Sequence, residues 1–421
     1  MVNCIPPTTS DLLTFRMNGR MTSLDQFRGY SVAGMVVVNF LAGLAAIHPI
    51  LKHNNTYFSL ADTIMPGFLF AAGFSFRLTV LRRIEQAGAA AAYRRAVIRS
   101  LALIFVSLAM FGFDGGFRSW EEMSAGGVRE FLAGLVKAHL WNVLAIIGAT
   151  QLVVLPVVAA RPMVRVLAIA GLLMLHLLLS WSFNCEFVYA RPNWLDAYWG
   201  AASTRAWDGG FFGVIAWSVP VLAGTLAYDM CTAEAKPVRR LIGWGAGLMV
   251  LGYLLSCMAR LYEPWPSAAT TRATAGEPAS VISPVWPPLD RLASRPWTAL
   301  VSEPPFVAPP PPEVRPRSYW AMDKRVVTTS FTLFGSGFSL ALFGLFVLIC
   351  DVGGHELWLF RIFGQNPLAA YLLLYPIEKT IRAIVPKDAP LWWCLVGLAA
   401  CFAVLAMFVR YLDRHKLYLR L

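Results

Sequence analysis

Three polar residues lie close together at the edge of the first apolar stretches of the chain. His53 and Asp62 belong to "LKHNNTYFSLAD" (51–62), and Asn39 lies inside the apolar stretch before it. A carboxylate beside an imidazole fixes the ring tautomer and stabilises the imidazolium, which makes histidine a general base. An amide can donate to a developing oxyanion. These residues are predicted to be catalytic, with His53 as base, Asp62 as its orienter and Asn39 as donor.

Each of the three also has a purely structural explanation. A loop histidine can simply be solvated, Asp62 can cap the helix that follows it, and Asn39 can form a hydrogen bond between membrane helices. His48, which is followed by Pro49, has the same explanations and no carboxylate close to it in sequence. The residues alone leave both interpretations open.

The composition is that of a polytopic membrane protein. Of the 421 residues, 57% are hydrophobic and 14% are charged, against roughly 25% charged in soluble domains. The net charge of +12 is assigned to basic loops near lipid, so no nucleic-acid partner is expected. The seven cysteines are scattered and predict no disulfide framework. No cleavable signal peptide is expected, because the first 28 residues lack a compact apolar core.

Apolar windows of the length that a bilayer core requires, about 20 residues, recur along the whole chain. They predict an all-α fold, a polytopic membrane helix bundle of about ten transmembrane helices. The ninth window contains Asn366 and Pro367, so we expect either one broken helix or a short helix followed by a span. The windows lie near 29–47, 62–81, 96–113, 140–160, 164–183, 210–230, 241–259, 327–350, 366–386 and 391–411.

Basic residues predict the orientation of this bundle, because lysine and arginine in short loops are retained in the cytoplasm. The basic clusters between the second and third windows, after the fourth, after the sixth and at the C-terminus all fall on one side. Both termini are therefore predicted to be cytoplasmic, with His53 outside. The predicted segments are a cytoplasmic N-terminus (1–28), seven helices with the catalytic loop (29–259), an external loop (260–325) and three helices with a short tail (326–421).

The external loop has an unusual composition. It holds 14 of the 27 prolines, and proline-rich segments lack backbone donors and favour an extended polyproline conformation. We therefore expect it to be partly disordered or draped over the surface. Its tryptophans, Trp265, Trp286 and Trp297, leave open whether it is a spacer or a lid over a site at the outer face.

Three segments carry a resemblance to a known family. The first runs from "SLDQFRG" (23–29) through Asn39, "LKH" and "AD" to "MPGFLFAAG" (65–73). The others are "VVTTSFTLFGSG" (326–337) and "FGQNPLAAYLL" (363–373). Together they resemble the catalytic region of the heparan-alpha-glucosaminide N-acetyltransferase family and its bacterial relatives. The spacing from Asn39 to His53 is longer than in that family, and the stretch to Asp62 lacks its usual Trp and Gly, which leaves the acceptor open.

The resemblance implies an activity and assigns further residues to it. The implied reaction is acetyl transfer from acetyl-CoA to an amino group of an extracytoplasmic sugar or glycan, with His53 as general base or transient acetyl carrier. Arg28, Ser330 and Asn366, which lie in the three segments, are assigned to acetyl-CoA binding, and the arginines of 77–99 either attract its phosphates or merely set the topology. The implied location is the bacterial inner (plasma) membrane. No metal is expected, and a homodimer is left open.

Two other functions are carried as alternatives. A proton-coupled transporter or lipid-carrier flippase would use Asp62 and His53 as a proton relay, but such proteins usually contain internal repeats, which this sequence does not show. A glycan O-acyltransferase shares the Leu-Asp-x-x-Arg-Gly start, but that family typically has a histidine where this chain has Asn39. For the N-acetyltransferase, we expect Asn39, His53 and Asp62 to surround one cavity, with Ser330 and Asn366 nearby.

Overall fold

The computed structural model describes residues 21–111, 119–201, 204–233, 236–263, 283–310 and 316–419, and every regular element in them is helical. The predicted all-α fold is confirmed. Residues 1–20 of the predicted N-terminal segment and residues 264–282 and 311–315 of the predicted external loop lie outside the described residues. The α-helices are α1 (Thr22–Leu41), α2 (Ile64–Ala87), α3 (Ala89–Phe111), α4 (Trp120–Glu122), α5 (Val128–Gly134), α6 (Val143–Val154), α7 (Pro162–Leu179), α8 (Cys185–Val188), α9 (Trp194–Trp199), α10 (Gly210–Ala233), α11 (Pro237–Ser256), α12 (Trp297–Leu300), α13 (Thr329–Phe346), α14 (Trp358–Gln365), α15 (Pro367–Arg382) and α16 (Leu391–Arg414).

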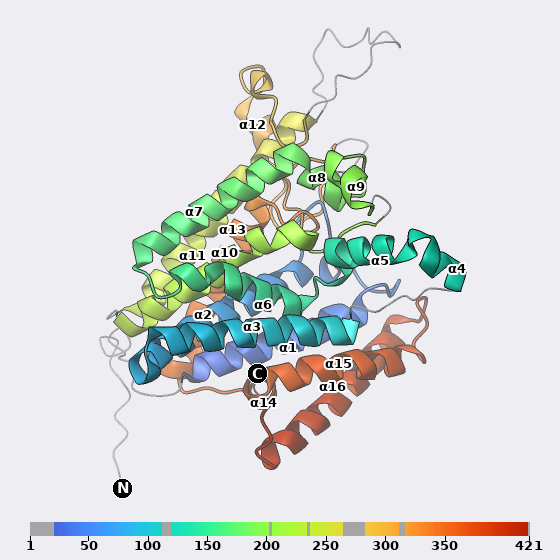
Figure 1. Cartoon of the computed structure of the whole chain (residues 1–421). Helices are drawn as coiled ribbons and strands as arrows, with labels where there is room; N and C mark the ends of the chain where they lie inside the picture. The colour runs from blue at the N-terminus through green and yellow to red at the C-terminus, as the bar shows by residue number, and fades with distance from the viewer. Residues whose placement is uncertain are drawn as a thin grey trace.

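The long helices lie side by side in one bundle (Figure 1). The short helices α5, α8 and α9 lie close together at the right-hand end of the bundle in this view. Each window predicted from the sequence overlaps one long helix of this bundle; the ten are α1, α2, α3, α6, α7, α10, α11, α13, α15 and α16. The loop after α1, which carries His53, therefore lies at the opposite end of that helix from Thr22.

A membrane-spanning fold is supported by the length and apolar character of the helices. Within the described residues, six helices are long and apolar enough to cross a membrane: Ala61–Ala87, Pro162–Val188, Gly210–Thr232, Pro237–Tyr262, Thr329–Val352 and Leu391–Arg414. A seventh crossing results if the pair Val128–His139 and Val143–Val157, bent by 78°, crosses as one. Three helices of the predicted windows are not among these spans. α1 and α3 carry charged residues in their first halves, and α15 has only 16 residues. Ten membrane crossings therefore stay a prediction.

The ends of two helices differ from the predicted windows because polar residues pair across the bundle. α1 begins at Thr22, inside the predicted cytoplasmic segment, and Gln26 is buried there. Its amide exchanges two hydrogen bonds of 3.2 Å with the backbone of Leu357, the residue before α14. In the ninth window the chain breaks at Asn366, and Pro367 begins α15, a position that suits proline because the first helical N–H is unpaired anyway.

α11 and α13 pack closely along a row of glycines. Gly245 on α11 faces Gly337 on α13, and a Cβ atom on Gly245 would lie 2.7 Å from the carbonyl oxygen of Gly337. Further along the same contact, Gly252 lies against the backbone of Ser330, and Gly344 lies against Ile242. Small residues let membrane helices approach to backbone contact, where van der Waals packing is strongest. This contact holds the first residue of α13 beside the last turn of α11.

An ion cluster with two buried arginines joins three helices at the end of the bundle away from His53. Asp229 on α10 accepts hydrogen bonds from Arg77 on α2, at 2.6 Å, and from Arg165 on α7. Arg77 also donates to the carbonyl of Val158. Charges at membrane depth are costly unless they are paired, and this pairing satisfies Arg77. Arg77 is thus a buried structural residue, and it is not part of an exposed basic rim.

The described part of the external loop is anchored to the bundle at several points. The backbone N–H of Phe306 donates to the carbonyl of Phe58 in the loop after α1, at 2.8 Å. The hydroxyl of Tyr319 lies 3.0 Å from Nδ1 of His176 on α7. Trp286 and Trp297 are exposed and line neither cavity at His53. These contacts fix the path of the chain into α13.

The glycine row gives a stability prediction. We expect Gly245→Ala to lower the stability of the bundle by about 1–3 kcal/mol, because the new methyl group must push α13 away. Gly247 lies on the same helix with open space around it, so Gly247→Ala should be neutral or stabilising by up to about 1 kcal/mol. Thermal unfolding of the detergent-solubilised variants compares the two, and equal melting temperatures would contradict the close packing.

Candidate active site

The loop between α1 and α2, residues 42–63, folds back on itself. The hydroxyl of Ser59 lies 2.8 Å from the carbonyl oxygen of Lys52, and the side-chain amide of Asn54 donates to the same oxygen at 2.8 Å. Short polar side chains that bond nearby backbone groups stabilise turns of this kind. The fold of the loop therefore brings its middle residues next to the residues that lead into α2.

Aromatic packing fixes this loop against α13. Phe58 is fully buried, and its ring centroid lies 4.8 Å from that of Phe334 and 5.1 Å from that of Phe331. Phe306 of the external loop packs on the same ring at 6.1 Å. Such aromatic contacts contribute about 0.5–1.5 kcal/mol each beyond the area that they bury. These contacts place the polar residues on either side of Phe58 in the loop at a defined depth in the bundle.

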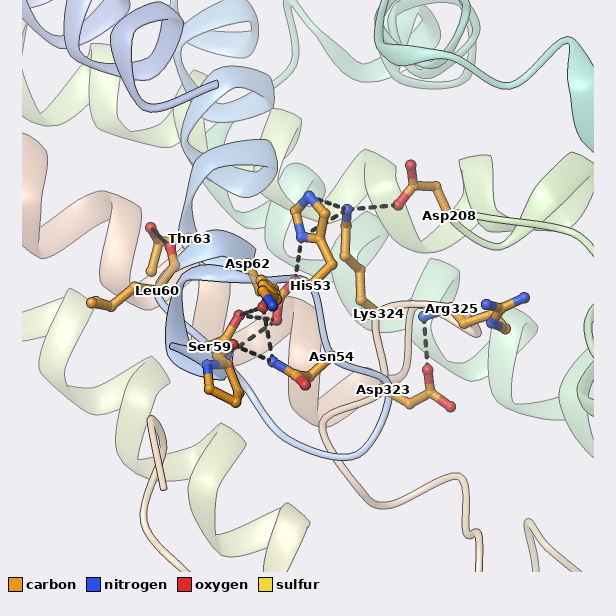
Figure 2. A network of polar contacts seen from close by, with 12 residues as sticks. His53, Asn54, Ser59, Leu60, Asp62, Thr63, Asp208, Asp323, Lys324 and Arg325 are labelled. Atoms are coloured by element: carbon orange, nitrogen blue, oxygen red, sulfur yellow. Dashed lines mark hydrogen bonds and ion pairs between the residues drawn. The ribbon is translucent and has the colours of Figure 1, made fainter. Parts of the chain in front are cut away.

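His53 and Asp62 form the pair that the sequence predicts. Nδ1 of His53 lies 2.8 Å from Oδ1 of Asp62 (Figure 2). The other carboxylate oxygen, Oδ2, accepts from the backbone N–H of Ser59 at 3.1 Å and lies 2.6 Å from its hydroxyl. The side chain of Asp62 is fully buried, whereas 22% of the His53 side chain is exposed. The carboxylate is thus hidden behind a ring that remains accessible.

His53 stands between two cavities. The inner one, of about 200 Å³, is lined by Met35, Val38, Asn39, His53, Ile64, Met65, Phe68, Asn142, Val143, Trp207, Asp208, Lys324 and Tyr371. The outer one, of about 880 Å³ and more open, is lined by Asn39, Ala42, Gly43, Lys52, His53, Trp207, Tyr375, Glu378, Lys379, Arg382 and Ala383. Three residues, Asn39, His53 and Trp207, line both. Asn39 and His53 therefore share their surroundings, whereas Asp62, which was expected to line the same cavity, lines neither.

A lysine from the far end of the external loop reaches the same ring. Nζ of Lys324 lies 3.4 Å from Nδ1 and 3.5 Å from Nε2 of His53, and 3.1 Å from Oδ1 of Asp208. In Figure 2 the lysine and Asp208 approach the ring on the side away from Asp62. The imidazole is therefore enclosed by a carboxylate on one side and by an ammonium–carboxylate pair on the other.

The turn that carries Lys324 is organised by the residue before it. Asp323 is buried, and its Oδ1 accepts from the backbone N–H of Arg325 at 2.7 Å and of Val326 at 3.3 Å. Its Oδ2 accepts from the hydroxyl of Tyr189. Burial nevertheless raises the pKa of Asp323 to about 6, because the charged form has lost its hydration.

Both partners of the lysine pair lie beside backbone in the left-handed region. Asp208 has φ 51°, and Val327 has φ 62°, which is a genuine outlier for a β-branched residue. Gly209 and Gly210, which follow Asp208 into α10, also have positive φ, and a Cβ on Gly210 would lie 2.4 Å from the carbonyl oxygen of Lys137. Glycine is required there because the chain turns sharply against a neighbouring backbone.

The residues assigned to acetyl-CoA binding are not gathered at His53. The hydroxyl of Ser330 donates to the carbonyls of Trp320 and Ala321. The amide of Asn366 is bonded to the backbone of the C-terminal tail. Arg28 contacts Ser75 and pairs with Asp25 at 3.3 Å. None of the three lines either cavity, so their assigned role stays a prediction without support from these contacts.

Sequence reasoning missed Lys324 and Asp208. They are separated by more than a hundred residues and belong to no motif with a defined spacing. One signal was present, because "WDGG" (207–210) places a carboxylate directly before an apolar window, as "AD" (61–62) does. The lysine had no such signal, since it ends a proline-rich loop whose path the sequence does not predict.

Asp323 should give the folded protein a measurable pH dependence. Its folded pKa of about 6 lies above the ordinary 3.8, so its contribution to stability is present below pH 4 and is lost as the pH rises through 6, by about 3 kcal/mol in all. Asp323→Asn keeps an acceptor but cannot ionise. The melting temperature of this variant relative to the wild type should therefore rise between pH 4 and pH 7, and a constant difference would contradict the assignment.

Comparison with known proteins bears on the same residues. A family model described as "Heparan-alpha-glucosaminide N-acetyltransferase, catalytic" matches residues 20–252, which is more than half of the chain. The match contains Asn39, His53, Asp62 and Asp208, while Lys324 lies beyond it. The search of curated proteins gave no match. On the extent of the family match, the chain belongs to the heparan-alpha-glucosaminide N-acetyltransferase family.

Proposed function

We propose that this protein is a membrane-embedded N-acetyltransferase that moves an acetyl group from cytosolic acetyl-CoA to an amino group of an extracytoplasmic sugar or glycan. Membership of the family supports acetyl transfer. The observation that carries the proposal is the place of His53, which is bonded to Asp62 at 2.8 Å and lines two cavities at once. A base in that position can serve a donor in one cavity and an acceptor in the other.

The hydrogen bonds of His53 define its chemistry. An ionised carboxylate only accepts, so Nδ1 donates to Asp62 and the neutral ring keeps its lone pair on Nε2. The ammonium of an amino sugar must lose a proton before its nitrogen can attack a thioester, and imidazole is suited to that step near neutral pH. Asp62 then stabilises the imidazolium. Asn39 supplies an amide that can donate to the reacting carbonyl.

The two cavities differ in the groups that they offer. The inner cavity is lined mainly by apolar side chains, among them Met35, Met65 and Phe68, which suit the acetyl thioester end of the donor. The outer cavity is open and lined by charged and aromatic side chains, including Lys52 and Tyr375. A polar sugar ring fits such a surface, because hydroxyl groups find partners there.

The same geometry supports a covalent route. In this route Nε2 of His53 attacks the thioester carbonyl, the thiolate of CoA leaves, and the amine later attacks the acetyl-imidazole. Rapid gel filtration after a pulse of labelled acetyl-CoA without acceptor distinguishes the routes. Label that stays on the wild type but not on His53→Ala indicates the covalent route, and no retained label indicates direct transfer.

The orientation in the membrane is also part of the proposal. Arg82, Arg83, Arg94 and Arg95 lie around the connection from α2 to α3, at the end of the bundle away from His53. Since basic loops are retained in the cytoplasm, that end is assigned to the cytoplasm and His53 to the outside. The acetyl group must then pass along the bundle interior to reach the inner cavity.

Cysteine labelling tests this orientation. An exposed residue of the external loop, Ser294, and an exposed residue at the end of α2, Gln86, lie at the two ends of the bundle. A membrane-impermeant maleimide should label Ser294→Cys in intact cells, and it should label Gln86→Cys only after permeabilisation. The reverse pattern would place His53 in the cytoplasm and remove the need for transfer across the membrane.

Substitutions at the His53 pair test the activity itself. With labelled acetyl-CoA and a panel of amino sugars, His53→Ala should lose about 10²–10⁴-fold in rate, the usual contribution of a general base. Asp62→Asn should fall between this variant and the wild type, because it loses the charge that holds the imidazolium. His48 accepts only a local hydrogen bond from Ile50, so His48→Ala should remain active.

The same assay separates the rival functions. A wild type that acetylates only hydroxyl groups would indicate a glycan O-acyltransferase. A wild type that neither transfers acetyl groups nor hydrolyses acetyl-CoA would end the enzyme proposal. If His53→Ala and the wild type are equally active, the reaction does not use this base.

A further inference from the structure

Lys324 is the one permanent cation among the described residues that line the inner cavity. Its side chain is 9% exposed, and Asp208 is its ion-pair partner at 3.1 Å. A buried ammonium is costly unless it is paired, and one carboxylate does not use its three protons. The remaining capacity of Lys324 lies at the cavity wall, 3.5 Å from Nε2 of His53.

The backbone on both sides of this pair is held in costly conformations. Asp208 and Val327 have φ values of 51° and 62°, and residues in such regions cost of order 1–3 kcal/mol each. Asp323 is buried in the turn that carries Lys324 and bonds two of its backbone N–H groups. The fold thus gives up stability in order to hold the ammonium at the His53 ring. A lysine that served only solubility or packing would not need strained backbone to hold it.

We propose that Lys324 is a catalytic residue that stabilises the oxyanion formed on the acetyl carbonyl, and that Asp208 is the positioning residue that holds it. The inference rests on the proposed function. Reacting atoms in a productive complex lie about 3–3.5 Å apart, so a carbonyl attacked next to Nε2 of His53 lies within reach of Nζ of Lys324. A preorganised cation in a site shielded from water stabilises such a charge more than water does.

The step balances without another reactant. The amine has first lost its ammonium proton to Nε2 of His53, which passes that proton to water. The amine nitrogen then forms a bond to the thioester carbon and gives a second proton to Nε2 of His53, while the carbonyl π electrons move to oxygen, next to the Lys324 ammonium. The intermediate collapses when the carbon–oxygen double bond re-forms and the carbon–sulfur bond breaks. The thiolate of CoA takes the proton back from the imidazolium. Lys324 transfers no proton in this step, and Asn39, which lines the same cavity, can share the oxyanion.

Kinetics of Lys324 variants test the role. We expect Lys324→Met to lose about 10²–10³-fold in kcat, the usual effect of removing an oxyanion donor, with a smaller change in KM. Lys324→Arg should recover part of the loss because it keeps a charged donor, and Asp208→Asn should lose less than Lys324→Met. Arg317 lies in the same loop and lines neither cavity, so Arg317→Met should match the wild type.

A second measurement separates catalysis from loop structure. S-trifluoroacetonyl-CoA hydrates to a tetrahedral form that mimics the oxyanion, whereas S-acetonyl-CoA stays a planar ketone. The wild type and Arg317→Met should prefer the first inhibitor, and Lys324→Met should lose that preference by about 10²-fold. If Lys324→Met is too unstable to purify, the same ratio measured on Lys324→Arg and Asp208→Asn should be reduced.

The outcomes distinguish this inference from the proposed function. A folded Lys324→Met variant within threefold of wild-type kcat, or one with an unchanged inhibitor ratio, overturns the role of Lys324 and leaves the acetyltransferase intact. An unchanged ratio in both Lys324→Arg and Asp208→Asn does the same if Lys324→Met cannot be purified. A wild type without any acetyl transfer instead overturns the proposed function, and the role of Lys324 falls with it.

Discussion

A carboxylate that is fully removed from water needs other groups to satisfy its oxygens, and Asp62 imposes this requirement at the mouth of the bundle. It is met by His53 on one oxygen and by the amide and hydroxyl of Ser59 on the other. The 42–63 loop must double back for both residues to reach one side chain. Phe58, next to Ser59, then packs on α13. The position of the imidazole thus follows from how one buried charge is satisfied.

Three other carboxylates are paired in different ways, and each fixes a different part of the fold. Asp229 accepts hydrogen bonds from two arginines and so joins α2, α7 and α10. Asp323 accepts hydrogen bonds from backbone N–H groups and shapes the turn before α13. Asp208 forms an ion pair with Lys324 and so connects the start of α10 to that turn. The contacts of Asp62, Asp208 and Asp323 thereby fix the 42–63 loop, the start of α10 and the turn before α13 next to the His53 ring.

Much of this architecture can be predicted from the sequence because bilayer thickness sets a strong length signal. All ten predicted windows overlap a helix, and the His53–Asp62 pair follows from a short loop between two of them. The structure begins the first helix at Thr22, before the predicted window, and there the Gln26 amide pairs with the backbone of Leu357, far along the chain. The number of crossings and the roles of individual residues are not settled by hydropathy.

The prediction was weakest where residues meet only through tertiary contacts. Ser330 and Asn366 were grouped with His53 because they belong to motifs, yet their side chains bond to nearby backbone. Lys324 and Asp208 were missed because nothing local marks them as partners. A motif identifies residues that a family retains, but only packing decides which of them face the same cavity.

The glycine row between α11 and α13 also affects how freely the chain between them can change in length. A Cβ on Gly252 would lie 2.9 Å from the carbonyl oxygen of Ser330, so α11 and α13 are in backbone contact on either side of segment 257–328. This contact between the helices holds the two ends of the segment together. Doubling the length of a flexible loop adds only about 0.6 kcal/mol to the entropy cost of closing it. Insertions between the anchored residues of this segment can therefore be accommodated over evolution at little cost, while its last residues, held by α13 and by Asp323, keep the lysine at the histidine ring.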